Sequence, residues 1–302
     1  MTRLQKLKSS MANNPESSMK NTQEESGKDK TEQKSSIKVT ISGSGTSSGI
    51  PAIACKCRVC KSADPKDKRN RAAAFVTDGT FTIAIDAGPE FRIQALNYGL
   101  SRLDAVLITH SHADHIHGLD DIRCFSEEKA LPVYANRPTL ANVKNCYDYV
   151  FKPTQKGGGK PQLDLQNAEI FNLKNPLAIG SMKIVPVPML HGVLPVFGWR
   201  INNFAYLTDL SKIENEGLQR LNGIKCLVID GLRSEEHETH CTFAQALDIA
   251  CQTSAEEVYI THIAHDYSHA EICRILKEEQ AKRPALYGKT VAPAYDGMEI
   301  SI

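Results

Sequence analysis

The sequence has no excess of either charge, few aromatic residues and no long apolar run. Its 302 residues include 36 Lys and Arg against 35 Asp and Glu, which gives a formal net charge of +1, and only 6% are aromatic. A charge this close to zero excludes the broad basic surface that non-specific nucleic-acid binding requires. No apolar stretch approaches the ~18 residues of a membrane helix, so membrane partners are not expected.

The N-terminus lacks the apolar block of a secretory signal. A transit peptide is the alternative, because residues 1–15 are basic and contain no acid, but they have no apolar face. Nine cysteines are an odd number, and Cys-x-Cys-x-x-Cys is more typical of a metal site in a reducing compartment than of a disulfide framework. We therefore expect a cytoplasmic protein.

Composition divides the chain at about residue 36. Residues 1–36 are rich in Lys, Ser, Glu, Gln and Asn, contain no aromatic residue, and are predicted to be a disordered polar tail. From residue 37 onwards, short apolar runs typical of strands alternate with helical patterns, and the first strands are clustered. This favours an α/β sandwich with helices outside two sheets. A Gly-rich segment at 157–159, within 152–164, is predicted to be a loop or lid.

The predicted elements can be given by residue range. Strands are expected at 38–42, 80–85, 105–108, 182–187, 204–207, 226–229 and 258–260, and helices at 90–97, 138–150, 213–221, 242–252 and 269–281.

The strongest functional signal is the His-Ser-His-Ala-Asp-His segment, residues 110–115, directly after an apolar run. It places four ligand-type side chains within six positions: His110, His112, Asp114 and His115. In extended chain, His110 and His112 point the same way, while Asp114 and His115 turn towards a neighbouring point. The segment could therefore serve two adjacent cations, whereas the plain alternative is a polar loop with satisfied histidines.

This motif resembles that of the metallo-β-lactamase superfamily, which implies a four-layer αβ/βα sandwich with a dinuclear metal site at one edge of two facing sheets. The resemblance implies that His110 and His112 share one metal with His191. It implies that Asp114 and His115 share the other with His262, and that Asp209 bridges the pair. His191, Asp209 and His262 each follow an apolar run. Asp86, also after a strand, is expected to orient the motif loop; an ordinary turn cap is its alternative, and His117 is either a support or a plain loop residue.

A second metal site is predicted in the Cys-rich loop at 54–61. Cys55, Cys57 and Cys60 offer three thiols and need a fourth ligand to close a tetrahedral structural zinc site. His265, three residues after His262, is the candidate. Unpartnered surface thiols and a redox pair are the alternatives. The other six cysteines lie in apolar segments and are expected to be packed thiols.

The Cys loop after Gly43-Ser44-Gly45-Thr46, the His-x-x-His pair and the ending Tyr-Asp-Gly-Met-Glu-Ile are together similar to the cyclic-phosphate phosphodiesterase branch. This resemblance, over residues 37–302, implies hydrolysis of a small cyclic phosphate such as phosphoribosyl 1,2-cyclic phosphate. It implies two catalytic divalent cations, manganese or zinc, and pairing as a homodimer. Asp114 and His240 are then the catalytic residues, with His240 as proton donor and His237 as its competitor. The 43–49 turn and Arg69 or Arg71 are weak candidates for phosphate binding.

Two alternatives stay open within the superfamily. A tRNA 3′-processing endonuclease shares the histidine motif, but this sequence contains no large basic insertion for gripping tRNA. A lactone or thioester hydrolase could use the same ligands. A non-enzymatic metal-binding scaffold is a third interpretation, which the complete ligand set disfavours.

Overall fold

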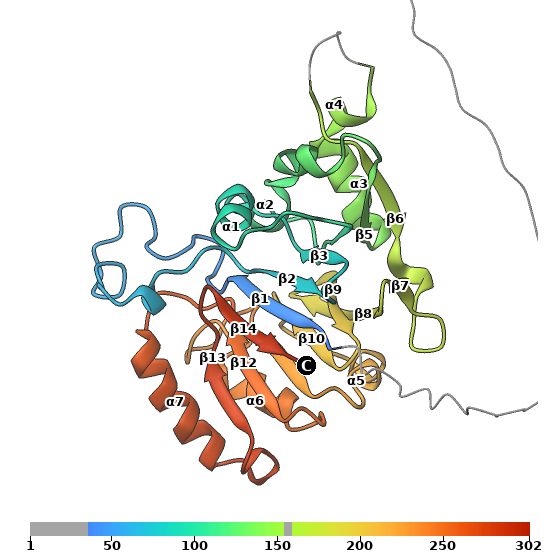
Figure 1. Cartoon of the computed structure of the whole chain (residues 1–302). Helices are drawn as coiled ribbons and strands as arrows, with labels where there is room; N and C mark the ends of the chain where they lie inside the picture. The colour runs from blue at the N-terminus through green and yellow to red at the C-terminus, as the bar shows by residue number, and fades with distance from the viewer. Residues whose placement is uncertain (1–35, 154–158) are drawn as a thin grey trace, which may run out of the picture. The chain divides into compact units, whose positions relative to one another are not determined.

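Two seven-stranded sheets face one another in the described part of the chain, residues 36–153 and 159–302 of this computed structural model (Figure 1). In spatial order the first sheet contains β14 (Met298–Ser301), β1 (Lys38–Gly43), β2 (Ala73–Thr77), β3 (Thr82–Ile85), β4 (Ala105–Leu107), β5 (Leu131–Ala135) and β6 (Leu163–Asn167). The second contains β13 (Thr290–Pro293), β12 (Glu257–Thr261), β11 (Cys226–Asp230), β10 (Phe204–Leu207), β9 (Leu194–Ile201), β8 (Met182–His191) and β7 (Leu177–Ile179).

Helices cover the outer faces of both sheets. Over the first sheet lie α1 (Phe91–Asn97), α2 (Ala113–Ile116), α3 (Arg137–Cys146), α4 (Asp148–Phe151) and the 3₁₀ segment η2 (Leu119–Phe125). The second sheet is covered by α5 (Asn215–Arg220), α6 (Phe243–Ala250) and α7 (His269–Ala281). Short 3₁₀ turns complete the set: η1 (Pro65–Asp67), η3 (Ala168–Ile170) and η4 (Pro284–Leu286). The predicted four-layer αβ/βα sandwich is confirmed.

Three apolar cores hold the layers together. The core between the sheets contains Trp199, Phe204 and Tyr206, all fully buried. A second core lies between the second sheet and α6 and α7, and a third between the first sheet and α1, α3 and η2. Both faces of each central strand are therefore buried, which explains why strands such as β11 (Cys-Leu-Val-Ile-Asp) have a continuous apolar run instead of an alternating pattern.

The structure differs from the predicted elements in two instructive places. Strand β8 was expected to end at Val187, but it runs on to His191 through Pro186 and Pro188, beside its antiparallel partner β9 near the sheet edge. The helix predicted over 138–150 is divided at Tyr147, whose buried side chain donates a hydrogen bond to the Ile116 carbonyl, 2.8 Å away. Tertiary contacts override the local pattern in both places.

The predicted tail at 1–36 lies almost wholly outside the described residues, as do residues 154–158 of the predicted loop. Among the residues that the structure does describe, no helix is long and apolar enough to cross a membrane.

Candidate metal centres

The candidate ligands come together where strands of both sheets end. His110 follows β4, His191 is the last residue of β8, Asp209 follows β10, and His262 follows β12. Parallel strands β10, β11 and β12 end at the same edge of their sheet, so residues far apart in the sequence meet there. The first sheet contributes the motif loop from the facing side.

Two of these strand ends, and the end of β3 at Asp86, have an unusual backbone. Asp86, Asp209 and His262 adopt left-handed conformations, with φ of 63°, 54° and 58°. For residues other than glycine such conformations are uncommon, and they cluster at functional sites where the surrounding structure compensates their cost. Each turns its side chain sharply out of the strand direction at the sheet edge.

The first group of ligand atoms contains His110, His112 and His191, whose ring nitrogens lie within 4.8 Å of one another. His110 Nε2 and His112 Nδ1 are 2.9 Å apart. Two nitrogens bound at ~2.0–2.1 Å to one zinc ion at tetrahedral angles are about 3.4 Å apart, so a metal ion would need these rings to separate by a few tenths of an ångström. The geometry therefore fits a shared metal ion between these imidazoles.

The second group contains Asp114, His115, Asp209 and His262. His115 Nε2 lies 3.1 Å from both Asp114 Oδ2 and Asp209 Oδ2, and His262 Nε2 lies 3.4 Å from Asp209 Oδ1. Asp209 Oδ1 is also 3.9 Å from His110 Nε2 in the first group. One carboxylate thus reaches both groups, as a bridging ligand would.

Buried nitrogens without partners also fit a metal. His115 Nε2 and both ring nitrogens of His262 are buried and have no hydrogen-bond partner among the described residues. A buried polar atom left unpaired costs about 1–3 kcal/mol, so such atoms need an explanation. Here the nitrogens and carboxylate oxygens face common points without forming hydrogen bonds to each other. Divalent cations at these points would satisfy them.

Electrostatics divide the cluster into neutral and charged groups. Burial lowers the pKa of His110 well below its usual value, which keeps that imidazole neutral. Burial alone would raise the pKa of Asp209, but the surrounding His262, His115 and His110 hold it well below its usual range. Against the effect of burial, Asp209 in turn raises the pKa of His115 well above its usual value and also raises that of His262. A metal ion bound here would therefore displace protons from these two rings.

Hydrogen bonds behind the ligands fix which nitrogen faces the site. His115 Nδ1 donates to Asp86 Oδ2 at 2.7 Å, and His191 Nδ1 donates to the Thr239 carbonyl at 2.8 Å. In the neutral ring each bond places the proton on Nδ1, so Nε2 is the nitrogen available to a metal ion. Fully buried Asp86 also accepts from the Thr109 amide and hydroxyl, both at 2.8 Å, so it holds the motif loop as expected.

His240 lies beside this cluster and is held by an acid that sequence reasoning missed. Its Nδ1 is 2.8 Å from Asp230 Oδ2, and its ring stacks on His262 with centroids 4.6 Å apart. Asp230 is fully buried at the end of β11. A polar residue at a strand end was the available signal, but its partner comes ten residues later and only the fold brings the two together.

The Cys-rich loop forms a separate group with His265. The Sγ atoms of Cys55, Cys57 and Cys60 lie 3.4, 3.3 and 3.5 Å from His265 Nδ1. Zn–S bonds of ~2.3 Å and a Zn–N bond of ~2.0–2.1 Å at tetrahedral angles place sulfur and nitrogen about 3.5 Å apart. The Cys60 amide and His265 lower the pKa of Cys57 to about 6, whereas burial raises that of Cys60 to about 11. The donor set fits one closed zinc site.

Other expectations are corrected by the structure. Arg69 is buried and its guanidinium donates to Ser44 Oγ and the Ala294 carbonyl, so it does not face the cluster. Arg71 is paired with Glu90. His117 is exposed at the end of α2, which favours a plain loop residue. Of the six cysteines expected to be packed, two are buried (Cys226, Cys241), one is half-buried (Cys251) and three are exposed (Cys124, Cys146, Cys273).

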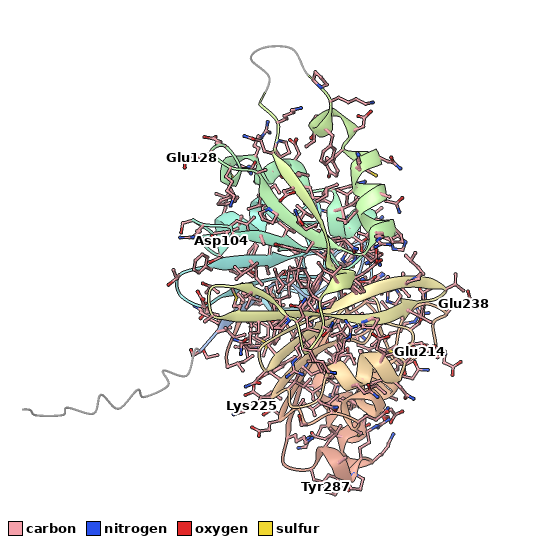
Figure 2. The ribbon with its side chains drawn as sticks, turned by 90° about the vertical axis from the view of Figure 1, so that its right-hand side faces the viewer. Asp104, Glu128, Glu214, Lys225, Glu238 and Tyr287 are labelled. Carbon is pink, nitrogen blue, oxygen red and sulfur yellow. The ribbon has the colours of Figure 1, made fainter. Side chains whose placement is uncertain are left out.

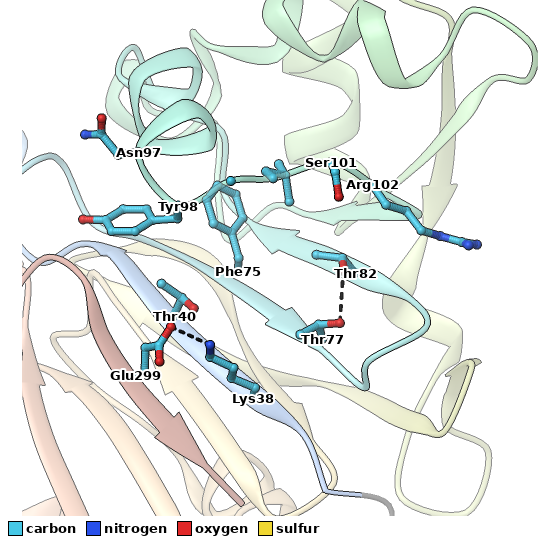
Figure 3. A pocket seen from close by; sticks show the side chains of 12 residues that line it. Lys38, Thr40, Phe75, Thr77, Thr82, Asn97, Tyr98, Ser101, Arg102 and Glu299 are labelled. Carbon is cyan, nitrogen blue, oxygen red and sulfur yellow. Dashed lines mark hydrogen bonds and ion pairs between the residues drawn. The ribbon is translucent and has the colours of Figure 1, made fainter.

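A cavity of about 390 Å³ lies on the outer face of the first sheet, away from every candidate ligand (Figure 3). Its two cations are already paired, Lys38 with Glu299 and Arg102 with Asp104. Because its charged lining residues are paired and it holds no cluster of metal-ligating groups, the cluster at the strand ends is the candidate active site.

Comparison with known proteins agrees with this geometry. The model of the β-lactamase superfamily domain matches residues 82–263. A solved diphosphatase of the PhnP family is 35% identical, superposes with a TM-score of 0.77, and the match covers 88% of this chain and 97% of that one. Zn²⁺-bound PqqB from Methylobacterium extorquens, 18% identical with a TM-score of 0.68 over 87% of this chain and 99% of its own, shares the fold.

One curated relative is longer. An octanoyltransferase from Porphyromonas gingivalis is 37% identical over 263 residues, which are 86% of this chain but 50% of the relative. The chain therefore spans about half the length of that protein. Taken with the family match and the diphosphatase, these findings show that the chain belongs to the metallo-β-lactamase superfamily, in its PhnP-like branch.

Proposed function

We propose that this hydrolase is a dinuclear-metal phosphodiesterase acting on a small cyclic phosphate such as phosphoribosyl 1,2-cyclic phosphate. The observation that carries the proposal is the pairing of two ligand groups, bridged by Asp209, with an acid-oriented histidine, His240, at their side. The similarity to a diphosphatase of the PhnP family supports phosphoryl chemistry.

His110, His112 and His191 would hold one cation, and Asp114, His115 and His262 the other, with Asp209 between them. Such a cation pair supplies a water of lowered pKa and neutralises charge on phosphoryl oxygens. Imidazole and carboxylate donors suit manganese or zinc. Cys55, Cys57, Cys60 and His265 would hold a separate structural zinc ion.

His240 is the proton donor to the leaving alkoxide. Asp230 accepts the Nδ1 proton, so Nε2 is the nitrogen left to face the substrate. The same carboxylate fixes the orientation of the ring, as a positioned general acid requires. Asp230 itself is held by the Leu210 amide, 2.7 Å from Oδ2, and the pair therefore keeps a fixed orientation at the edge of the ligand groups.

Nucleic acid is not the expected substrate, because the near-neutral chain supplies no basic surface to hold a long polyanion. An acyl thioester is the second candidate substrate. The relative from Porphyromonas gingivalis, half of whose length matches this chain, is named an octanoyltransferase.

A substrate panel tests the proposal. Metal-loaded protein is assayed against phosphoribosyl 1,2-cyclic phosphate, a linear diphosphate diester, an octanoyl thioester, an acyl lactone and a precursor tRNA, with Asp209→Ala as the matched inactive control. Cleavage of the cyclic phosphate, absent in the control, is expected. Hydrolysis of only the thioester or the lactone would overturn the assignment.

A further inference from the structure

Arg233 is a half-buried cation near the candidate active site. Its Nε is buried and has no hydrogen-bond partner among the residues that the structure describes. The other buried or half-buried arginines of residues 36–153 and 159–302 all donate to carboxylates, hydroxyls or carbonyls: Arg69, Arg71, Arg200, Arg220 and Arg283. A buried donor without an acceptor is costly, so a ligand that supplies an acceptor to Nε would be favoured.

The backbone holds Arg233 close to the catalytic groups. Its carbonyl accepts from the Phe243 amide at 3.0 Å, and the preceding Leu232 is bonded to the Cys241 carbonyl and to the Ala264 amide. These bonds tie the segment to the residue after His240 on one side and to the loop after His262 on the other. The backbone of Arg233 is therefore fixed near the ligand groups.

His237 presents a second donor at the same rim. Its ring centroid lies 5.1 Å from that of His240. The Thr239 amide donates to His237 Nδ1 at 3.3 Å, so in the neutral ring the proton is on Nε2, which is left to donate outwards. Arg233 lies near enough to lower the pKa of His237, after the larger effect of burial.

The acids of this segment leave the two donors free. Glu235 accepts a hydrogen bond from the Tyr267 hydroxyl at 2.7 Å, and the Asp230 carboxylate is engaged by His240 and the Leu210 amide. Glu236 and Glu238 are exposed. Figure 2 shows Glu238 at the outer edge of the molecule. The Tyr267 hydroxyl, and to a smaller extent Arg233, lower the pKa of Glu235, so this acid lies near Arg233. Within residues 36–153 and 159–302, however, the Arg233 Nε has no hydrogen-bond partner, and His237 Nε2 is left to donate.

We propose that Arg233 and His237 form an anion subsite that binds a second phosphate of the substrate, one that is not cleaved. The inference rests on the proposed function and sharpens it: the substrate is a phosphate ester that also carries a separate phosphomonoester. The planar guanidinium can hold two phosphate oxygens at once, and His237 Nε2–H can hold a third. Arg233 is a specificity-determining residue, since it touches the group that does not react.

A matched pair of substrates tests this subsite. Phosphoribosyl 1,2-cyclic phosphate and ribosyl 1,2-cyclic phosphate differ only in the distal phosphate. Arg233→Gln should raise KM for the first about 10- to 100-fold, as expected for a lost charged hydrogen bond, with kcat little changed. The second substrate should be cleaved as by the wild type, and Arg233→Lys should restore part of the loss. Exposed Arg274→Gln is the control.

Equal losses on both substrates, or no loss on either, would overturn the subsite. If neither cyclic phosphate is cleaved, the proposed function fails. The anion subsite is then tested separately, by calorimetric binding of ribose 5-phosphate and of ribose to the metal-loaded protein. Ribose 5-phosphate should then bind Arg233→Gln about tenfold more weakly than wild type. Identical binding by the two proteins would contradict the proposal.

Discussion

The two candidate metal centres are built in different ways. The dinuclear cluster collects ligands from β4, β8, β10 and β12, buried strand ends that belong to two sheets. The zinc site takes three of its four ligands from one loop of six residues and the fourth from His265. The dinuclear cluster is positioned by the core of the protein, whereas the zinc site is positioned by a loop that packs against few buried apolar residues.

Packing around the two centres shows the same contrast. Behind the catalytic ligands, Asp86, Asp230 and the Thr239 carbonyl hold three imidazoles by hydrogen bonds. Around the Cys loop the buried apolar cluster consists of only Ile50, Val59 and Cys60. We infer that the catalytic site keeps its shape without metal, whereas the Cys loop depends on its zinc ion for order.

The largest expected effect comes from the carboxylate shared by both ligand groups. Asp209→Ala should reduce phosphodiester turnover by about 10⁴-fold or more, because it removes a ligand from each cation at once. Catalytic metal content should fall while the structural zinc remains. Elemental analysis and circular dichroism of the variant check this; a protein that keeps all its metals would remove Asp209 from the bridge.

The second largest effect is expected at His240, where a loss of proton transfer can be distinguished from a loss of bound metal. His240→Ala should lower kcat by about 10²- to 10⁴-fold, as expected for loss of a general acid, with metal content unchanged. Asp230→Asn, which only loosens the orientation of His240, should cost about 10- to 100-fold. Turnover equal to that of the wild type would exclude His240 from the mechanism.

Removing one thiol ligand from the Cys-rich loop should lower the stability of the protein more than its catalytic activity. Cys57→Ser should release the structural zinc and lower the thermal midpoint by several degrees, an effect of ~1–3 kcal/mol, while the catalytic pair stays bound. Cys124→Ser, at an exposed cysteine away from both centres, is the control. If Cys57→Ser abolished catalytic metal binding, the two centres would not be independent.

The smallest expected effect is on the stability of the folded protein at low pH, and it comes from His269 near the zinc loop. Burial, and then Arg69, lower the pKa of His269 to about 4. Because the unfolded imidazole titrates near 6.5, the unfolded chain binds a proton first, so stability falls as the pH drops from about 6.5 to 4. His269→Gln should remove about 1–2 kcal/mol of this loss, after allowance for its partial exposure. Urea unfolding at pH 7 and 4.5 measures it, and identical pH dependence would contradict it.

The candidate ligands were predicted from the motif at 110–115 and from the resemblance to the metallo-β-lactamase superfamily, which implied His191, Asp209 and His262. A ligand-type residue directly after a buried apolar run is visible in the chain itself, as at His110, Asp209 and His262. Seven strands were not predicted, since their sequences are short or contain Ala, Pro, Gly or polar residues that leave little pattern: β2, β5, β6, β7, β9, β13 and β14. Asp230 and Arg233 could not be found in this way, because their roles arise only when the segment after β11 folds back on His240.

Metal analysis under graded chelation tests the central claim, that one chain holds a dinuclear catalytic site and an independent zinc site. We predict about three metals per chain, of which two are removed by mild chelation together with activity, while one zinc remains until the protein unfolds. In Cys57→Ser that resistant metal should be missing. Only two metals per chain in the wild type, both lost with activity, would contradict the account.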